Sequence, residues 1–116
     1  MILTLFAGAV SAQNPKTEEL TKLYNAMEFE KTIVKAREFL KDNPQNMDYN
    51  AFLGRALVDV GQYVEAIPLL KFVAENDNTW RKALSVGYLG SVYYMLADYE
   101  NAKAALQTAM QLNRFN

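Results

Sequence analysis

The sequence Leu53-Gly54-Arg55-Ala56-Leu57, followed by Gly61-Gln62-Tyr63-Val64-Glu65-Ala66, returns in altered form later in the chain. Its second version is Leu89-Gly90-Ser91-Val92-Tyr93, followed by Ala97-Asp98-Tyr99-Glu100-Asn101-Ala102. The offset is 36 residues for each of three matching pairs: Gly54 and Gly90, Tyr63 and Tyr99, Ala66 and Ala102. An internal repeat of this length indicates stacked supersecondary units.

Apolar residues elsewhere recur at spacings of three and four, as on one face of a helix. Leu20, Leu23, Tyr24 and Met27 form one such stripe. Turn-forming residues interrupt the pattern at 42–44, 61–62, 76–78 and 97–98. We therefore predict six helices joined by short turns, so that consecutive helices are antiparallel neighbours. Asn14 and Asp98 are the expected N-caps of the first and last of them.

Small residues mark where the paired helices should approach closely. Gly54 with Ala66, and Gly90 with Ala102, lack bulk at matching positions, which allows helix axes about 8–10 Å apart. The first helix of the third unit should start early, near residues 78–80. Trp80 is expected to pack on the preceding unit, and a ligand-facing aromatic is its alternative role.

These positions resemble the tetratricopeptide repeat family, a 34-residue helix–turn–helix unit with the pattern W-x₂-L-G-x₂-Y…A-x₃-F…P. The matching segments lack the tryptophan and read Asn50-x₂-Leu53-Gly54-x₂-Leu57…Ala66-x₃-Leu70 and Val86-x₂-Leu89-Gly90-x₂-Tyr93…Ala102-x₃-Leu106. The resemblance implies an all-α, right-handed α-solenoid of about three antiparallel helix pairs. Its domain would span residues 13–116, with units at about 13–46, 47–82 and 83–116.

In this family the first helix of each unit lines a concave groove that holds a segment of a partner protein. The resemblance therefore implies a protein–protein interaction module or adaptor that binds a partner peptide. Carried over by register, the expected groove residues are Tyr24, Asp48, Arg55, Asp59, Leu84, Tyr88, Ser91, Tyr94 and Met95. Their aromatic and thioether groups favour an apolar or aromatic partner. Packing within the core is the alternative role for each tyrosine.

Composition removes most catalytic and cofactor-binding classes. The 116 residues contain no cysteine and no histidine, which removes thiol nucleophiles, zinc fingers and the commonest general base. The spacing of the five glycines matches neither the P-loop nor the dinucleotide-binding pattern. The formal net charge is −1, from 12 basic and 13 acidic residues. This balance does not indicate the basic surface that nucleic-acid binding requires. We expect no catalysis, no cofactor, no metal and no nucleic-acid partner.

Residues 1–12 are predicted to be a signal peptide. The segment from Ile2 to Ala12 is uncharged and apolar, and Val10-Ser11-Ala12 resembles a signal-peptidase site. This run is shorter than the ~20 residues of a stable membrane span. The expected location is therefore periplasmic or secreted. No basic residue precedes the run, however, and the alternative is an apolar helix packed on a cytoplasmic protein.

The last predicted helix carries apolar residues toward its end, including Leu106, Ala109, Met110 and Leu112. A solenoid needs a polar cap at an exposed end, and no further helix follows in this sequence. The expectations are a homodimer through the C-terminal helix, a fold-back of Phe115, or an N-terminal fragment of a larger multidomain protein. A structural or self-associating element is accordingly the alternative to the adaptor function.

Overall fold

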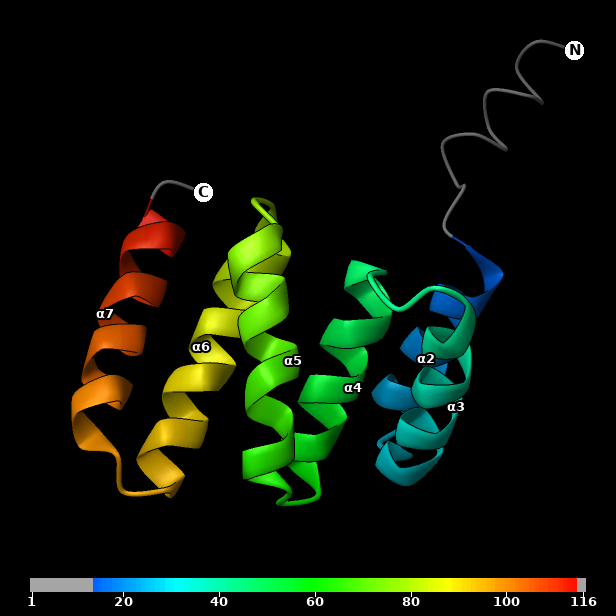
Figure 1. Ribbon diagram of the computed structural model, residues 1–116, viewed down its shortest axis with the longest axis horizontal. Helices are drawn as coiled ribbons and strands as arrows, with labels where there is room; N and C mark the ends of the chain where they lie inside the picture. Colours follow the sequence, from blue (N-terminus) through cyan, green and yellow to red (C-terminus); the bar gives the residue numbers. More distant parts are fainter. Residues whose placement is uncertain (1–13, 115–116) are drawn as a thin grey trace, which may run out of the picture.

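The computed structural model describes residues 14–114, so the predicted signal peptide at residues 1–12 lies outside the described range. Regular structure within this range is α-helical and contains no strand, which confirms the all-α class. The helices follow the chain in the order α2 Pro15–Asn25, α3 Phe29–Asp42, α4 Met47–Asp59, α5 Tyr63–Asn76, α6 Trp80–Met95 and α7 Tyr99–Arg114 (Figure 1). None of the six is both long enough and apolar enough to cross a membrane.

The helices pack in the order in which they occur in the chain, each against the next (Figure 1). We call α2, α4 and α6 the first helices of the three pairs, and α3, α5 and α7 the second helices. The first helices also contact one another, α2 against α4 and α4 against α6. Within the described residues the second helices make no such contacts with each other.

The turn within each helix pair has the same backbone geometry. Met27, Gly61 and Ala97 adopt left-handed conformations, with φ angles of 62°, 85° and 62°. The residue after each of them donates its amide hydrogen to a carbonyl five residues earlier, as in a Schellman motif: Glu28 to Leu23, Gln62 to Leu57 and Asp98 to Tyr93. The left-handed residues are spaced by 34 and 36 positions, so all three helix pairs share one turn.

Both predicted helix caps are present. The Asn14 side chain accepts a hydrogen bond from the Lys16 amide at 2.8 Å, with Pro15 in the first turn. The Asp98 carboxylate accepts one from the Asn101 amide at 3.3 Å. The prediction of an early start is also confirmed, since α6 has 16 residues, against 13 in α4, and begins at Trp80.

Close helix approach explains two glycines. A Cβ atom on Gly54 would lie 2.9 Å from Leu70 Cδ2, and one on Gly90 would lie 2.6 Å from Leu106 Cδ2. The other repeat positions serve the core or open a helix. Leu53, Ala66, Leu89 and Ala102 are buried, and α5 and α7 begin at Tyr63 and Tyr99. The small residues are therefore where packing requires them.

The expectation for Trp80 is wrong. Its side chain is 59% exposed instead of packed on the preceding pair. Trp80 is the first residue of α6, and the buried residues of that helix begin at Ala83. The indole therefore lies beyond the covered part of the helix, with the Arg81 guanidinium 5.0 Å from its ring centroid.

Candidate interaction site

The three first helices bring four of the predicted groove residues together. Tyr24 lies near the end of α2, Arg55 and Asp59 lie on α4, and Tyr88 lies on α6. Phe52 of α4, which the sequence analysis did not select, joins them. We call these five residues the Arg55 cluster. The cluster forms because the first helices contact one another directly.

A chain of hydroxyl groups links the three helices. The Tyr24 hydroxyl donates to Asp59 Oδ2 at 2.5 Å and lies 2.9 Å from the Tyr88 hydroxyl oxygen. Because the Tyr24 proton is directed to the carboxylate, the Tyr88 hydroxyl is the donor in the second bond. The chain holds both rings in place and engages one oxygen of Asp59.

This environment favours the neutral form of Tyr24. Burial raises the pKa of the Tyr24 phenol, and the hydrogen bonds with Asp59 and Tyr88 raise that pKa further, against a smaller opposing effect of Arg55. The physical cause is that a phenolate would be desolvated beside a carboxylate. Tyr24 therefore acts as a hydrogen-bond donor that fixes the cluster.

Arg55 lies among the aromatic rings of the cluster. Its Cζ atom is 4.3 Å from the centroid of the Tyr24 ring, 5.3 Å from that of Phe52 and 5.6 Å from that of Tyr88. These distances are those of cation–π contacts. Arg55 Nε is buried and has no hydrogen-bond partner within residues 14–114. In the same range, the salt bridges involve other basic residues. The guanidinium is therefore positioned by rings and not by an acid.

Asp48, another predicted groove residue, connects the starts of α4 and α6. Arg81 Nε donates to Asp48 Oδ1 at 2.6 Å, and Arg81 Nη1 lies 3.5 Å from Asp77 Oδ2. Burial alone would raise the pKa of Asp77, but hydrogen bonds from Thr79 and the charge of Arg81 lower it below its usual value. Asp48 is thus committed to an interhelix ion pair. The partner Arg81 had no local sequence signal, because it lies 33 residues after Asp48 and on another helix.

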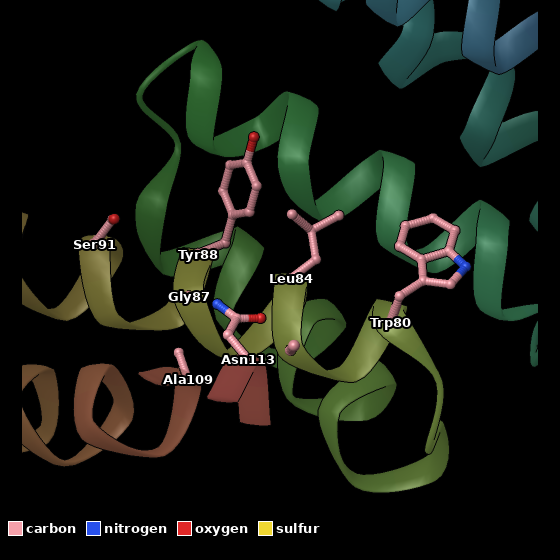
Figure 2. A pocket seen from close by; sticks show the side chains of 8 residues that line it. Trp80, Leu84, Gly87, Tyr88, Ser91, Ala109 and Asn113 are labelled. Atoms are coloured by element: carbon pink, nitrogen blue, oxygen red, sulfur yellow. The ribbon is translucent and has the colours of Figure 1, made fainter. Parts of the chain in front are cut away.

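Three predicted groove residues, Leu84, Tyr88 and Ser91, line an open depression of about 420 Å³ on α6. Its other lining residues are Trp80, Ala83 and Gly87 of α6 with Ala109 and Asn113 of α7. Figure 2 shows the side chains of Leu84 and Tyr88 on one side of Gly87, and Ala109 and Asn113 on the other. Tyr88 thus contributes to this depression as well as to the Arg55 cluster.

The last two predicted groove residues lie at the end of α6. Tyr94 and Met95 are exposed, and the Tyr94 ring packs against Tyr99 with 5.5 Å between centroids. They flank the α6–α7 turn and are not part of the Arg55 cluster. Register places Tyr94 at the position of Tyr24, but no further first helix follows α6 in the described range to enclose it.

The closest approach to a nucleophile–base pair is Ser85 with Lys82, three residues apart on α6. Lys82 Nζ donates to the carbonyl oxygen of Ala74 at 2.6 Å, and Ser85 is buried. Among residues 14–114 there is also no group of three or more carboxylates that could hold a metal ion. Where the first helices meet, the Arg55 cluster thus presents three aromatic rings, one arginine and one aspartate.

Scans of the sequence against models of protein families and against curated proteins return no match.

Proposed function

We propose that this chain is an exported adaptor of the tetratricopeptide type, without catalytic activity, that binds a segment of a partner protein along its first helices. The Arg55 cluster is the anchor of this binding site. The partner segment carries a carboxylate that pairs with Arg55 and apolar or aromatic side chains that contact the neighbouring rings. The apolar segment at residues 1–12 supports export.

Two features support a curved stack of helix pairs. The first helices contact each other while the second helices do not, within the described residues. A row of helices packed more closely on one side bends toward that side, so the first helices form the inner, concave surface. The shared left-handed turns at Met27, Gly61 and Ala97 indicate that the three pairs are versions of one unit.

The observation that carries the proposal is the state of Arg55. Its Nε is buried without a hydrogen-bond acceptor, although guanidinium groups are strong donors. The nearby carboxylate of Asp59 instead accepts a hydrogen bond from Tyr24. A carboxylate from a partner would meet the remaining guanidinium donors, and planar pairing of this kind gives directional recognition. The surrounding rings supply contact area at low cost in side-chain entropy.

The test is a selection of peptides from a random display library on the full chain, with affinities then measured by calorimetry. Selected peptides should be enriched in aspartate, glutamate or a free C-terminal carboxylate, next to apolar residues. Arg55→Gln should weaken their binding about 10- to 100-fold, because a charged hydrogen bond contributes about 1.5–3 kcal/mol. Asp59→Asn should strengthen binding, since it removes a negative charge beside the incoming carboxylate.

Arg37→Gln is the matched control. Arg37 lies on the second helix α3, where it pairs with Glu65, and is about half-exposed. This variant loses the same charge without touching the Arg55 cluster, so its peptide affinity should equal that of the wild type. Peptides that bind wild type and Arg55→Gln equally well would refute the proposal, provided both proteins have the same circular dichroism spectrum. Failure to select any peptide would refute it as well.

A further inference from the structure

Gly87, in the middle of α6, has no packing role among residues 14–114. A Cβ atom at Gly87 would meet nothing within 4 Å, whereas one at Gly54 or Gly90 would collide with a leucine. A glycine inside a helix is less favourable than alanine by about 1 kcal/mol. Glycine also allows another backbone to approach closely. The free space above Gly87 is therefore suited to an element other than residues 14–114 of the same chain.

The repeat shows what kind of element this is. Gly87 is 36 residues after Ala51, which is buried on α4. Val73 of α5, fully buried, has Ala109 of α7 as its counterpart at the same offset. The surface formed by α4 and α5 is the one against which α6 packs. The corresponding surface of α6 and α7, which we call the end face, is built to receive a helix.

The end face differs from the α4/α5 surface in charge. Asp48 and Asp77, which hold Arg81 of the incoming α6, are replaced at the same offset by Leu84 and Asn113. No lining residue of the depression carries a charge. The helix that occupies the end face therefore needs an uncharged contact surface, without an arginine in its first turn.

The chain itself contains such a helix. Residues 104–113 of α7 include no charged residue. Leu106, Ala109, Met110 and Asn113 follow the helical spacing of three and four along one side of α7, and Met110 is 70% exposed. Ala109 and Asn113 of this stripe border the depression, so the exposed Met110 side chain and the open hollow lie close together on α7.

We propose that two copies of this chain pair through their end faces about a two-fold axis, with α7 of each copy over Gly87 of the other. A two-fold contact joins the same surface of both subunits. The end face suits this arrangement, because it has both a projecting stripe and a hollow. The absence of charge on both means that pairing brings no like charges together. The contact also removes Met110 and Trp80 from water.

The test measures the mass of the full chain in solution by sedimentation equilibrium over a range of concentrations. The wild type should pass from the mass of one chain to that of two as concentration rises. Gly87→Leu should remain a single chain, because its side chain fills the hollow. Its folded monomer should be at least as stable as wild type, since the added Cβ meets no atom and leucine favours the helix. Association should weaken about tenfold or more.

Met110→Lys should have the same effect on association by placing a charge in the uncharged contact. Val34→Lys is the matched control, because Val34 is 64% exposed on α3, away from the end face. It should dimerise like the wild type. A wild type that stays monomeric throughout overturns the proposal. So does a dimer that Gly87→Leu and Met110→Lys leave unchanged, since association would then occur elsewhere. Binding of an unrelated protein to a strictly monomeric end face would likewise overturn it.

Discussion

The α4/α5 surface and the end face are two versions of one structure, and they differ in whether a helix lies on them. On the first, α6 packs against α4 and α5, where Ala51 and Val73 are buried, and holds Asp48 in an ion pair. On the second, the counterparts Gly87, Ala109 and Leu84 surround an open depression. The difference teaches that similar sequence positions become core or surface according to what packs on them. Substitutions at paired positions can test this.

The largest expected effect is on paired leucines of α5 and α7. Leu70→Ala should lower the free energy of unfolding by about 2–5 kcal/mol, because Leu70 is fully buried and its removal leaves a cavity. Leu106→Ala should cost only about 1 kcal/mol, since Leu106 is 41% exposed. Urea unfolding at low protein concentration measures both. Equal losses would show that the end face is already covered.

The ion pair between α4 and α6 gives the next largest effect. Asp48→Leu makes the α4/α5 surface resemble the end face and should destabilise the fold by about 1–2 kcal/mol. The reason is that Arg81 and Asp48 are both three-quarters buried. Glu65→Leu, which breaks the exposed pair with Arg37, is the control and should cost less than about 1 kcal/mol. Thermal unfolding of both variants measures the two losses of stability. A larger loss for Glu65→Leu than for Asp48→Leu would contradict this prediction.

Two glycine substitutions should change the free energy of unfolding in opposite directions. Gly54→Ala should destabilise the protein by about 1 kcal/mol, because the new methyl group would press on the fully buried Leu70. Gly87→Ala should stabilise the monomer by about 0.5–1 kcal/mol, because it meets no atom and alanine favours the helix. Denaturant midpoints at a concentration where the chain is monomeric give both values. A destabilised Gly87→Ala monomer would mean that the hollow is already occupied within the chain.

The smallest expected effect at neutral pH comes from removing the hydroxyl of Tyr24 or of Tyr94, its counterpart on α6. Because the folded state raises the pKa of Tyr24 above its ordinary value of 10.0, Tyr24 contributes stability that is present in full below pH 10. This contribution should be lost as pH rises through the folded-state pKa. Tyr24→Phe should reduce the alkaline loss of stability. Tyr94→Phe, which removes a hydroxyl from an exposed ring outside the Arg55 cluster, is the matched control. Unfolding curves between neutral and strongly alkaline pH provide the measurement.

Much of the fold could be predicted from the sequence because it depends on local spacing. The periodicity of apolar residues indicated six helices, and Gly54 with Gly90 marked the close approaches that the structure contains. The caps at Asn14 and Asp98 also depend on residues near in sequence. The solenoid itself and the family remain proposals.

The site was less predictable because it depends on what the neighbouring pair covers. Register alone placed Tyr24, Arg55 and Tyr88 in one row, and the structure brings them together. It missed the ion pair of Asp48, since Arg81 reaches that residue only because α6 begins early. The prediction for Trp80 was wrong at the same place, because Trp80 is the first residue of α6 and its side chain is 59% exposed. Both differences thus lie at the early start of α6.

Packing in chain order also determines how the molecule opens. Within the described residues α7 contacts α6 alone, whereas α4 contacts four other helices. A helix held by one neighbour can detach without disturbing the others, so local unfolding should begin at α7 and reach α4 last. Amide hydrogens of α7 should therefore exchange with solvent sooner than those of α4. Pairing of two copies through their end faces would protect the least stable helix of each.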